Sequence, residues 1–251
     1  MATVTDIYRY PVKGLSAEPL PRVTLTPGQT IPFDRAWAIE NGPSGFDPSE
    51  PKTLPKICFL MLMRNERLAE LATSLDEETS ALTVRKEGAV VAEGRLDTED
   101  GRHALEAFFR TFAADDLRGE PRVLTAPGHS FSDTAARVVS LINLETVRAL
   151  GTALGAEMHP LRFRGNLYVE NMPAWSEFDW VGKRVRIGAV EFTATKRIDR
   201  CAATNVNPLT AERDMTIPKN LLQIFGHADC GVYLRVETGG TLSVGDGVQA
   251  P

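Results

Sequence analysis

The sequence predicts a β-rich α+β fold with barrel-like sheets. Three observations predict it: many short apolar runs end at Gly or Pro turns, only three segments have helical spacing, and strands and helices do not alternate regularly. The 251 residues suit one large domain or two small ones. Apolar residues make up 43% and charged residues 24%, which is typical of a soluble globular protein.

In the first half, apolar runs bounded by turn residues indicate strands. The expected strands, in order along the chain, are Val4–Val12, Arg22–Thr26, Asp34–Glu40, Ile57–Met63, Ala81–Arg85 and Ala89–Glu93, and the last two form a hairpin. The apolar spacing of Leu68, Leu71 and Leu75 predicts a helix over residues 64–75. Thr98 is expected to cap a second helix that runs to about Ala113.

Residues 41–55 are rich in Gly, Pro and Ser, so they are expected to form a long loop. Loops of this length often act as lids over a site. Residues 127–133 form a second expected loop, and a domain boundary is expected near it. The predicted domains are residues 1–128 and 129–251.

In the second half, Asn143 is expected to cap a helix from Leu144 to Leu154 that ends at Gly155. The strands expected here are Arg122–Thr125, Val138–Ile142, Phe163–Glu170, Val185–Ile187, Val190–Ala194, Gly231–Glu237 and Thr241–Val244. The last four form two hairpins across Gly188-Ala189 and Gly239-Gly240.

Charge and cysteine usage narrow the function classes. The formal net charge of −5 gives no general attraction to nucleic acid, so a bound anion needs a local cluster of Lys and Arg. Cys58, Cys201 and Cys230 are odd in number and widely spaced, which argues against a disulfide framework. No signal peptide or membrane-spanning run is evident, so we expect a cytoplasmic protein with reduced thiols and no membrane partner.

The stretch Arg197–Pro208 places Cys201 directly after Arg200, at the end of an expected strand. A neighbouring cation favours the thiolate, which is the form that attacks or binds metal, and a soft thiolate suits soft or redox-active metals. The plain alternative is a strand-end cysteine that only fills space.

Four cations stand at strand ends or turns, where they could converge on an anion: Lys13, Arg35, Arg164 and Arg200. The planar fork of Arg matches phosphate or carboxylate with two parallel hydrogen bonds. The ordinary fate of each is a surface cation. Ser140 and Asn143 frame the start of the helix at Leu144, where unpaired N–H groups also favour anions.

Several motifs together resemble the MOSC (molybdenum cofactor sulfurase C-terminal) domain with the β-barrel domain that precedes it. The C-terminal motifs are Arg200-Cys201 through Asn207-Pro208, Arg213-Asp214, Gly226, Gly231-Val232-Tyr233 and Val244-Gly245-Asp246. The N-terminal motifs are Ile7–Leu15, Gly28 and Asp34-Arg35-Ala36-Trp37. The family includes the mitochondrial amidoxime-reducing component and bacterial proteins that detoxify N-hydroxylated bases.

The resemblance implies a molybdopterin molybdenum cofactor between two β-barrel-like domains, with Cys201 as the catalytic metal ligand. It implies that the cofactor is bound by residues carried over from the family motifs: Lys13, Gly14, Arg35, Ser140, Arg164, Asn166 and Arg200. The implied activity is reduction of small N-hydroxylated compounds. Gly14 stands where many relatives have Ser, and Asn207 replaces the usual Asp.

The electron source and two other functions stay open at this point. Some bacterial relatives carry a fused ferredoxin domain, which this sequence does not show. No nicotinamide or flavin motif is present either, so we expect a separate redox protein as electron donor. A cofactor carrier or a sulfur-transfer protein with a persulfide on Cys201 would need the same residues. A cysteine hydrolase would need a histidine placed near Cys201, which the sequence does not indicate.

Overall fold

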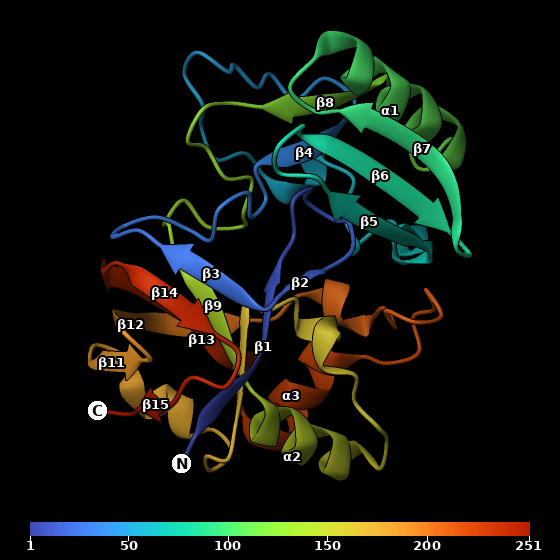
Figure 1. Cartoon of the computed structure of the whole chain (residues 1–251). Coiled ribbons are helices and arrows are strands. Elements are labelled where there is room, and N and C mark those ends of the chain that lie inside the picture. The colour runs from blue at the N-terminus through green and yellow to red at the C-terminus, as the bar shows by residue number, and fades with distance from the viewer.

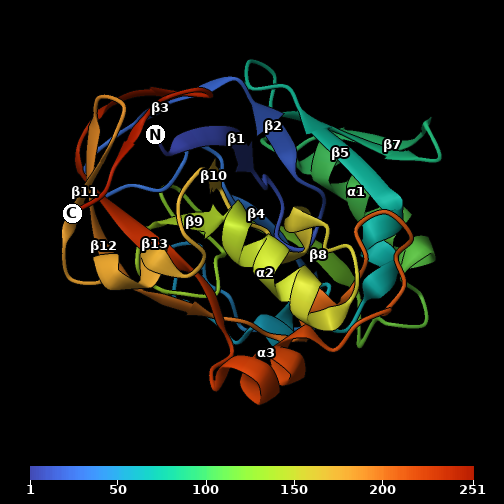
Figure 2. The ribbon, with the colours of Figure 1, turned by 90° about the horizontal axis from the view of Figure 1, so that it is seen from below.

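The computed structural model describes all 251 residues, which form two units, one above the other in Figure 1. A sheet with a helix on one face forms the upper unit, and a curled sheet with two helices below it forms the lower unit. The two ends of the chain lie side by side, because Val248 N donates a hydrogen bond to Ala2 O at 2.9 Å (Figures 1 and 2).

The lower unit is built on an eight-stranded sheet in the order β15-β11-β12-β13-β9-β10-β1-β2. Its strands are β1 (Thr3–Arg9), β2 (Glu18–Leu20), β9 (Val139–Asn143), β10 (Leu167–Glu170), β11 (Arg184–Ile187), β12 (Val190–Asp199), β13 (Asp229–Thr238) and β15 (Val248–Gln249). All neighbours are antiparallel except β9 and β10. A separate pair, β3 (Arg22–Leu25) and β14 (Gly240–Ser243), shares the apolar core that the sheet encloses.

The upper unit has two smaller sheets. β4 (Trp37–Asn41) pairs with β8 (Pro121–Thr125), and β5 (Leu71–Leu75), β6 (Ala81–Lys86) and β7 (Ala89–Arg95) form an antiparallel meander. Helix α1 (Glu99–Phe112) packs against β7 and buries Leu105 and Phe109. Strand pairing crosses the predicted boundary at residue 128, because β1 pairs with β10 and β3 with β14. The boundary itself stays a prediction.

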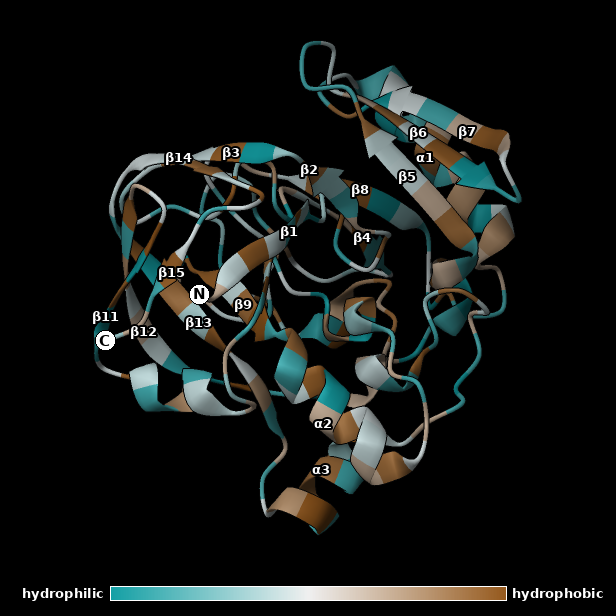
Figure 3. Ribbon diagram, turned by 60° about the horizontal axis from the view of Figure 1, so that its bottom comes forward, coloured by the Kyte–Doolittle hydropathy of each residue, from teal (hydrophilic) through white to brown (hydrophobic).

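Two helices lie side by side below the large sheet, α2 (Leu144–Leu154) and α3 (Ile217–Phe225). Figure 3 shows apolar positions on both, and Val147, Leu150, Ile217 and Leu221 share one buried cluster. Neither these helices nor α1 is long and apolar enough to cross a membrane. The β-rich α+β class predicted from the sequence is confirmed.

Both predicted caps are confirmed. Thr98 Oγ1 accepts a hydrogen bond from Gly101 N, and Asn143 Oδ1 accepts one from Glu145 N, so the first turns of α1 and α2 begin where expected. Gly155 ends α2 in the left-handed conformation. The predicted hairpins at β6–β7 and β11–β12 also form. The predicted hairpin between residues 231–237 and 241–244 is wrong, because β14 pairs with β3 and β13 pairs with β12 and β9.

The predicted helix over residues 64–75 is wrong. Residues 66–70 form a short 3₁₀ helix, and Leu71–Leu75 is strand β5, paired with β6. Leu71 and Leu75 are both buried at a spacing of four, which places side chains on one face of a helix but also on one face of a strand. Pairing with β6 decides between the two.

The predicted strand over residues 57–63 is also wrong, because Lys56–Cys58 is a 3₁₀ turn and only Phe59 makes an isolated bridge. Helix α3 was not predicted. Pro218 in its first turn, Ile217 and Leu221 at a spacing of four, and Gly226 at its end were sequence features that could have indicated it.

Asn143→Ala should destabilise the protein by about 2–4 kcal/mol. The side chain is fully buried, and besides capping α2 it donates to Pro173 O (2.9 Å) and Glu177 Oε2 (2.8 Å), so its loss leaves buried acceptors unpaired. Urea unfolding measures the change. Thr98→Ala, which removes a half-buried cap, is the control and should cost about 1 kcal/mol; equal losses in the two variants would contradict the role of Asn143 beyond capping.

Candidate functional site

A cleft of about 350 Å³ lies between the upper and lower units and is lined by residues of both. All eight residues predicted to form the site line this cleft: Lys13, Gly14, Arg35, Ser140, Arg164, Asn166, Arg200 and Cys201. They come from segments up to 188 positions apart in sequence, from 13 to 201, so the fold gathers them into one place.

Cys201 reaches the cleft because β12 ends at Asp199 and the chain then turns into a 3₁₀ helix over Ala202–Asn205. Thr204 fixes this turn, because its Oγ1 donates to Cys201 O at 2.9 Å. The side chain of Cys201 is half-buried, whereas burial raises the pKa of the enclosed Cys230 thiol to about 12. Of the three cysteines, Cys201 alone lines the cleft.

Arg200 is a structural clamp in this arrangement. Its Nε donates to Cys230 O and its Nη1 to Phe163 O, both at 2.8 Å, and its Nη2 also donates to Cys230 O. The guanidinium therefore ties the turn after Phe163 to strand β13. The expectation that Arg200 favours the thiolate of Cys201 gains no support from these contacts, because its donors serve backbone carbonyl groups.

Arg35 and Arg164 stack on the same aromatic ring. Their guanidinium carbons lie 4.5 Å and 4.3 Å from the centroid of Tyr10. Both residues have positive φ, at 54° and 48°, which turns these side chains out of the regular strand direction. Arg35 is paired with Asp34 and donates to Arg164 O at 3.1 Å, so its direction is fixed.

Among the cations of the cleft, only the exposed Lys196 and Arg164 lack a hydrogen-bond or ion-pair partner, and Arg164 is the less exposed of the two. Its guanidinium makes the stacking contact with Tyr10 but no hydrogen bond or ion pair. Burial, together with the charge of Arg35, lowers the pKa of Arg164 to about 10, although Tyr10 and Asp34 act in the opposite direction. The side chain still carries its charge at neutral pH and faces the cleft, which favours an anion there.

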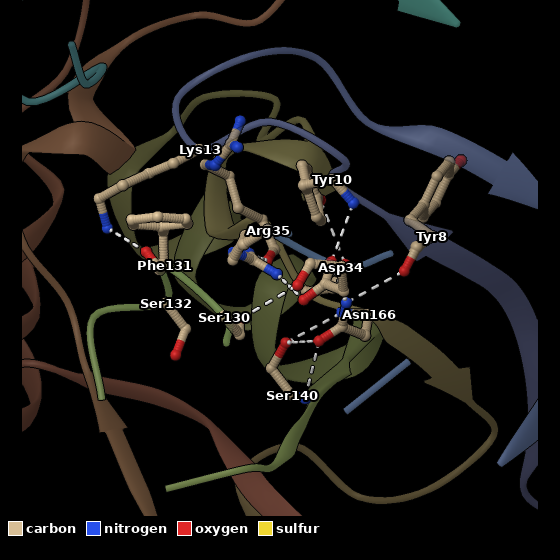
Figure 4. Close-up of polar contacts among 12 residues, drawn as sticks. Tyr8, Tyr10, Lys13, Asp34, Arg35, Ser130, Phe131, Ser132, Ser140 and Asn166 are labelled. Atoms are coloured by element: carbon tan, nitrogen blue, oxygen red, sulfur yellow. Dashed lines mark hydrogen bonds and ion pairs between the residues drawn. The ribbon is translucent and has the colours of Figure 1, made fainter. Parts of the chain in front are cut away.

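A buried polar network joins the two units beneath these cations (Figure 4). Asp34 Oδ1 accepts from Tyr10 N at 2.9 Å and from Asn166 Nδ2 at 3.1 Å. Asn166 Oδ1 in turn accepts from Ser140 Oγ at 2.8 Å, and Ser140 Oγ accepts from Asn166 N at 3.0 Å. Ser140 and Asn166 therefore line the cleft but use these polar groups to hold its floor together.

Lys13 is buried, with 7% of its surface exposed. Its Nζ donates to Phe131 O at 2.8 Å (Figure 4). The same ammonium group forms an ion pair with Asp133. Burial lowers the pKa of Lys13, while the charge of Asp133 opposes this shift. Lys13 is thus held in place by the loop between β8 and β9.

Several residues of the site were not predicted as such: Asp34, Lys56, Asp133 and Lys196. Asp34 stands in the Asp-Arg motif that drew attention only to Arg35. Lys56 and Asp133 lie at the ends of the two long loops, and a charged residue bordering such a loop was the one available indication.

A smaller apolar cavity of about 130 Å³ adjoins the cleft. The two share five lining residues: Gly14, Leu62, Arg162, Arg164 and Ala203. An engineered apolar cavity of about 150 Å³ is large enough to bind benzene, so this one is close to the size of a six-membered ring.

Comparison with protein families finds two domains in succession. Residues 1–119 match the family model of the MOSC N-terminal beta barrel domain, and residues 126–249 match that of the MOSC domain.

Two curated relatives are named molybdenum cofactor sulfurase. The protein from Caenorhabditis elegans is 24% identical over 246 residues and the match covers 93% of this chain; that from Anopheles gambiae is 28% identical over 267 residues and the match covers 90%. The chain spans 33% of the length of each relative.

Among solved structures, the YUAD protein from Bacillus subtilis has a TM-score of 0.45 at 13% identity, over 99% of this chain and 94% of that chain. YiiM from Geobacillus stearothermophilus has a TM-score of 0.37 at 15% identity, over 45% of this chain and 53% of that chain.

Gly14→Ala should destabilise the protein by about 2–4 kcal/mol. Gly14 has a φ of +86°, and a Cβ there would lie 2.7 Å from Leu60 O, so both backbone strain and a clash oppose any side chain. Thermal or urea unfolding measures the loss. Gly28→Ala is the matched control, with a φ of +66° and no atom within 4 Å of its added Cβ; it should lose about 1 kcal/mol. An equal loss in both variants would show that contact with Leu60 is unimportant.

Proposed function

Because the chain belongs to the MOSC domain proteins that carry an N-terminal MOSC β-barrel domain, we propose that it binds the molybdopterin molybdenum cofactor in the cleft and reduces N-hydroxylated compounds. The observation that carries this proposal is that Cys201 and the unpartnered guanidinium of Arg164 line the same cleft. The names of the curated relatives also support an association with this cofactor.

The residues present fit such a cofactor. Its phosphate needs cations in a chain whose net charge is −5, and Lys13, Arg35 and Arg164 bring positive charge to the cleft from both units. Its metal needs a soft ligand, and the half-buried Cys201 sulfur supplies one. The volume of about 350 Å³ lies within the range of small-molecule and cofactor sites.

When bound, the cofactor would supply the redox chemistry that removes oxygen from an N–OH group. The overall reaction takes two electrons and two protons, and yields the amine and water. The electrons would come from a separate redox protein, and the protons from solvent or an acid at the cleft, where Asp199 is available. In this proposal Cys201 ligates the metal, Lys13 and Arg164 bind the phosphate, and Arg35 orients Arg164 through its backbone carbonyl.

The adjoining apolar cavity is where we place the carbon skeleton of the substrate. It is lined by side chains of both units, and Ala203, two residues after Cys201, lines both it and the cleft. A planar aromatic group there would leave its N–OH end directed toward the cleft. This placement favours aromatic amidoximes or hydroxylated bases over large flexible substrates.

A second candidate function is cofactor carriage or sulfur transfer, with a persulfide on Cys201. The names of both curated relatives favour it, since each is a sulfurase, although the chain spans only a third of their length. Cyanide distinguishes the two functions, because it removes the outer sulfur of a persulfide as thiocyanate. Release of thiocyanate from Cys201 without any reduction of benzamidoxime would favour sulfur transfer.

Cys201→Ser should abolish reduction of benzamidoxime by protein that was produced in a cofactor-making host and is supplied with reduced dye. The serine hydroxyl is a much poorer ligand for a soft metal than a thiolate. Cys58→Ser is the control, because Cys58 is also half-buried but does not line the cleft, and it should retain activity. Full turnover by the Cys201 variant would count against a ligand role.

Arg164→Gln should lower the molybdenum and pterin content of the purified protein by about tenfold or more, the loss expected for one charged hydrogen bond. The variant should be no less stable than the wild type in urea. Folding lowers the pKa of Arg164, so the charged guanidinium is disfavoured in the folded state and a neutral side chain removes that cost. The exposed Arg148→Gln is the control for both measurements. A marked loss of stability with unchanged cofactor content would make Arg164 a structural residue.

A further inference from the structure

Asp133 is an acid in a cleft whose charged lining residues are mostly Lys and Arg. Its carboxylate is paired with Lys13 through Oδ1, and Oδ2 lies 3.9 Å from Lys56 Nζ. Lys56 also lines the cleft, at the end of the long loop between β4 and the 3₁₀ turn. Two lysines from different segments therefore face one carboxylate.

A carboxylate and a phosphate present similar oxygen acceptors to Lys and Arg, so a site that holds one can hold the other. Lys13 is buried and its charged form is disfavoured by burial, so the lysine needs an anion beside it. Burial acts to raise the pKa of Asp133, but the charges of Lys13 and Lys56 outweigh it and lower this pKa, which keeps Asp133 ionised.

The loop that carries Asp133 can release it without breaking a sheet. Up to residue 131 the loop is anchored, because Phe131 N donates to Arg35 O at 2.8 Å and Ser130 Oγ to Asp34 O at 3.1 Å. Between there and Arg137, whose Nη1 donates to Gln29 Oε1 at 2.7 Å, Ser132 and Ala136 bond only to Thr134, within the loop. The side chain of Asp133 is itself 49% exposed.

We propose that Asp133 is an internal substitute for the phosphate of the bound cofactor, and that Lys56 is a second phosphate ligand beside Lys13. On binding, the phosphate takes the place of the Asp133 carboxylate between the two lysines, and Asp133 turns to solvent. The ligand class is a phosphate monoester. The inference rests on the proposed function for the identity of that ester, but the exchange of anions does not depend on it.

Lys56 is well placed for this role because its backbone lies in a hydrogen-bonded turn whose following residues are anchored to strand β4. Cys58 N donates to Pro55 O at 2.9 Å, and Leu60 N donates to Ile39 O at 2.9 Å, which fixes the segment to strand β4. About a third of the Lys56 side chain is exposed, so it is not held by burial and its ammonium group is free to approach a phosphate.

The test measures, by calorimetry, the binding of inorganic phosphate to the 251-residue chain prepared from a host that does not make the cofactor. Asp133→Asn should strengthen binding by about threefold or more, because it removes the competing charge. Lys56→Ala should weaken binding by about two- to fivefold, the size expected for a partly exposed ion pair. Lys52→Ala is the matched control, because Lys52 lies on the same loop, is exposed and pairs with Glu50, and its change should leave binding unaltered.

Weaker binding by Asp133→Asn would overturn the proposal, because it would show that Asp133 positions Lys13 instead of competing for it. Equal effects of Lys56→Ala and Lys52→Ala would likewise overturn the role of Lys56. Circular dichroism of each variant confirms folding, and Asp133→Ser provides a second substitution at the same position.

Cofactor content separates this inference from the proposed function. If the phosphate affinities change as expected but no variant made in a cofactor-producing host contains molybdenum or pterin, the anion exchange stands and the proposed function fails. If the wild type contains the cofactor but Asp133→Asn and Lys56→Ala bind phosphate as the wild type does, the proposed function stands and this inference fails.

Discussion

The site depends on the interactions of one buried carboxylate, that of Asp34. It is 4% exposed, and it accepts hydrogen bonds from Tyr10 N and Asn166 Nδ2 while pairing with Arg35. One buried acid thus joins the first segment of the chain, the turn that carries Arg35 and the segment before β10. Because a buried charge is tolerated only with such partners, the three segments hold one another in a fixed arrangement, and the cleft keeps its shape.

The same arrangement shows how an acidic protein can present a cationic cleft. Arg35 and Arg164 would repel each other if both were free, but Asp34 compensates Arg35, and the face of Tyr10 attracts both guanidinium groups. Arg164 is left as an uncompensated charge beside this pair. The charge of Arg164 therefore favours binding of an anion in the cleft, and the neighbouring residues hold its side chain in place.

Local features of the fold could be predicted from the sequence, whereas pairing partners could not. Thr98 and Asn143 were recognisable as caps because the capping hydrogen bond is made within a few residues. Leu71 and Leu75 were misassigned because their spacing suits both a helix and a strand, and strand β6, ten residues on, decides the outcome. In the site, the cations of the family motifs were recognised, but the roles of Asp34 and Asp133 depend on contacts across the fold.

The contacts also divide the residues of the site by the groups they have left to offer. Arg200, Ser140 and Asn166 line the cleft, yet their hydrogen bonds go to backbone carbonyl groups, to Asp34 or to one another. The side chains of Cys201 and Arg164 make no hydrogen bonds within the protein, and Lys13 is paired with the half-exposed Asp133 on a loop. A motif shared across a family can therefore combine residues that bind with residues that only hold the binding residues in place. Sequence resemblance cannot separate the two, because both are required for the same site to exist; the hydrogen-bond partners can.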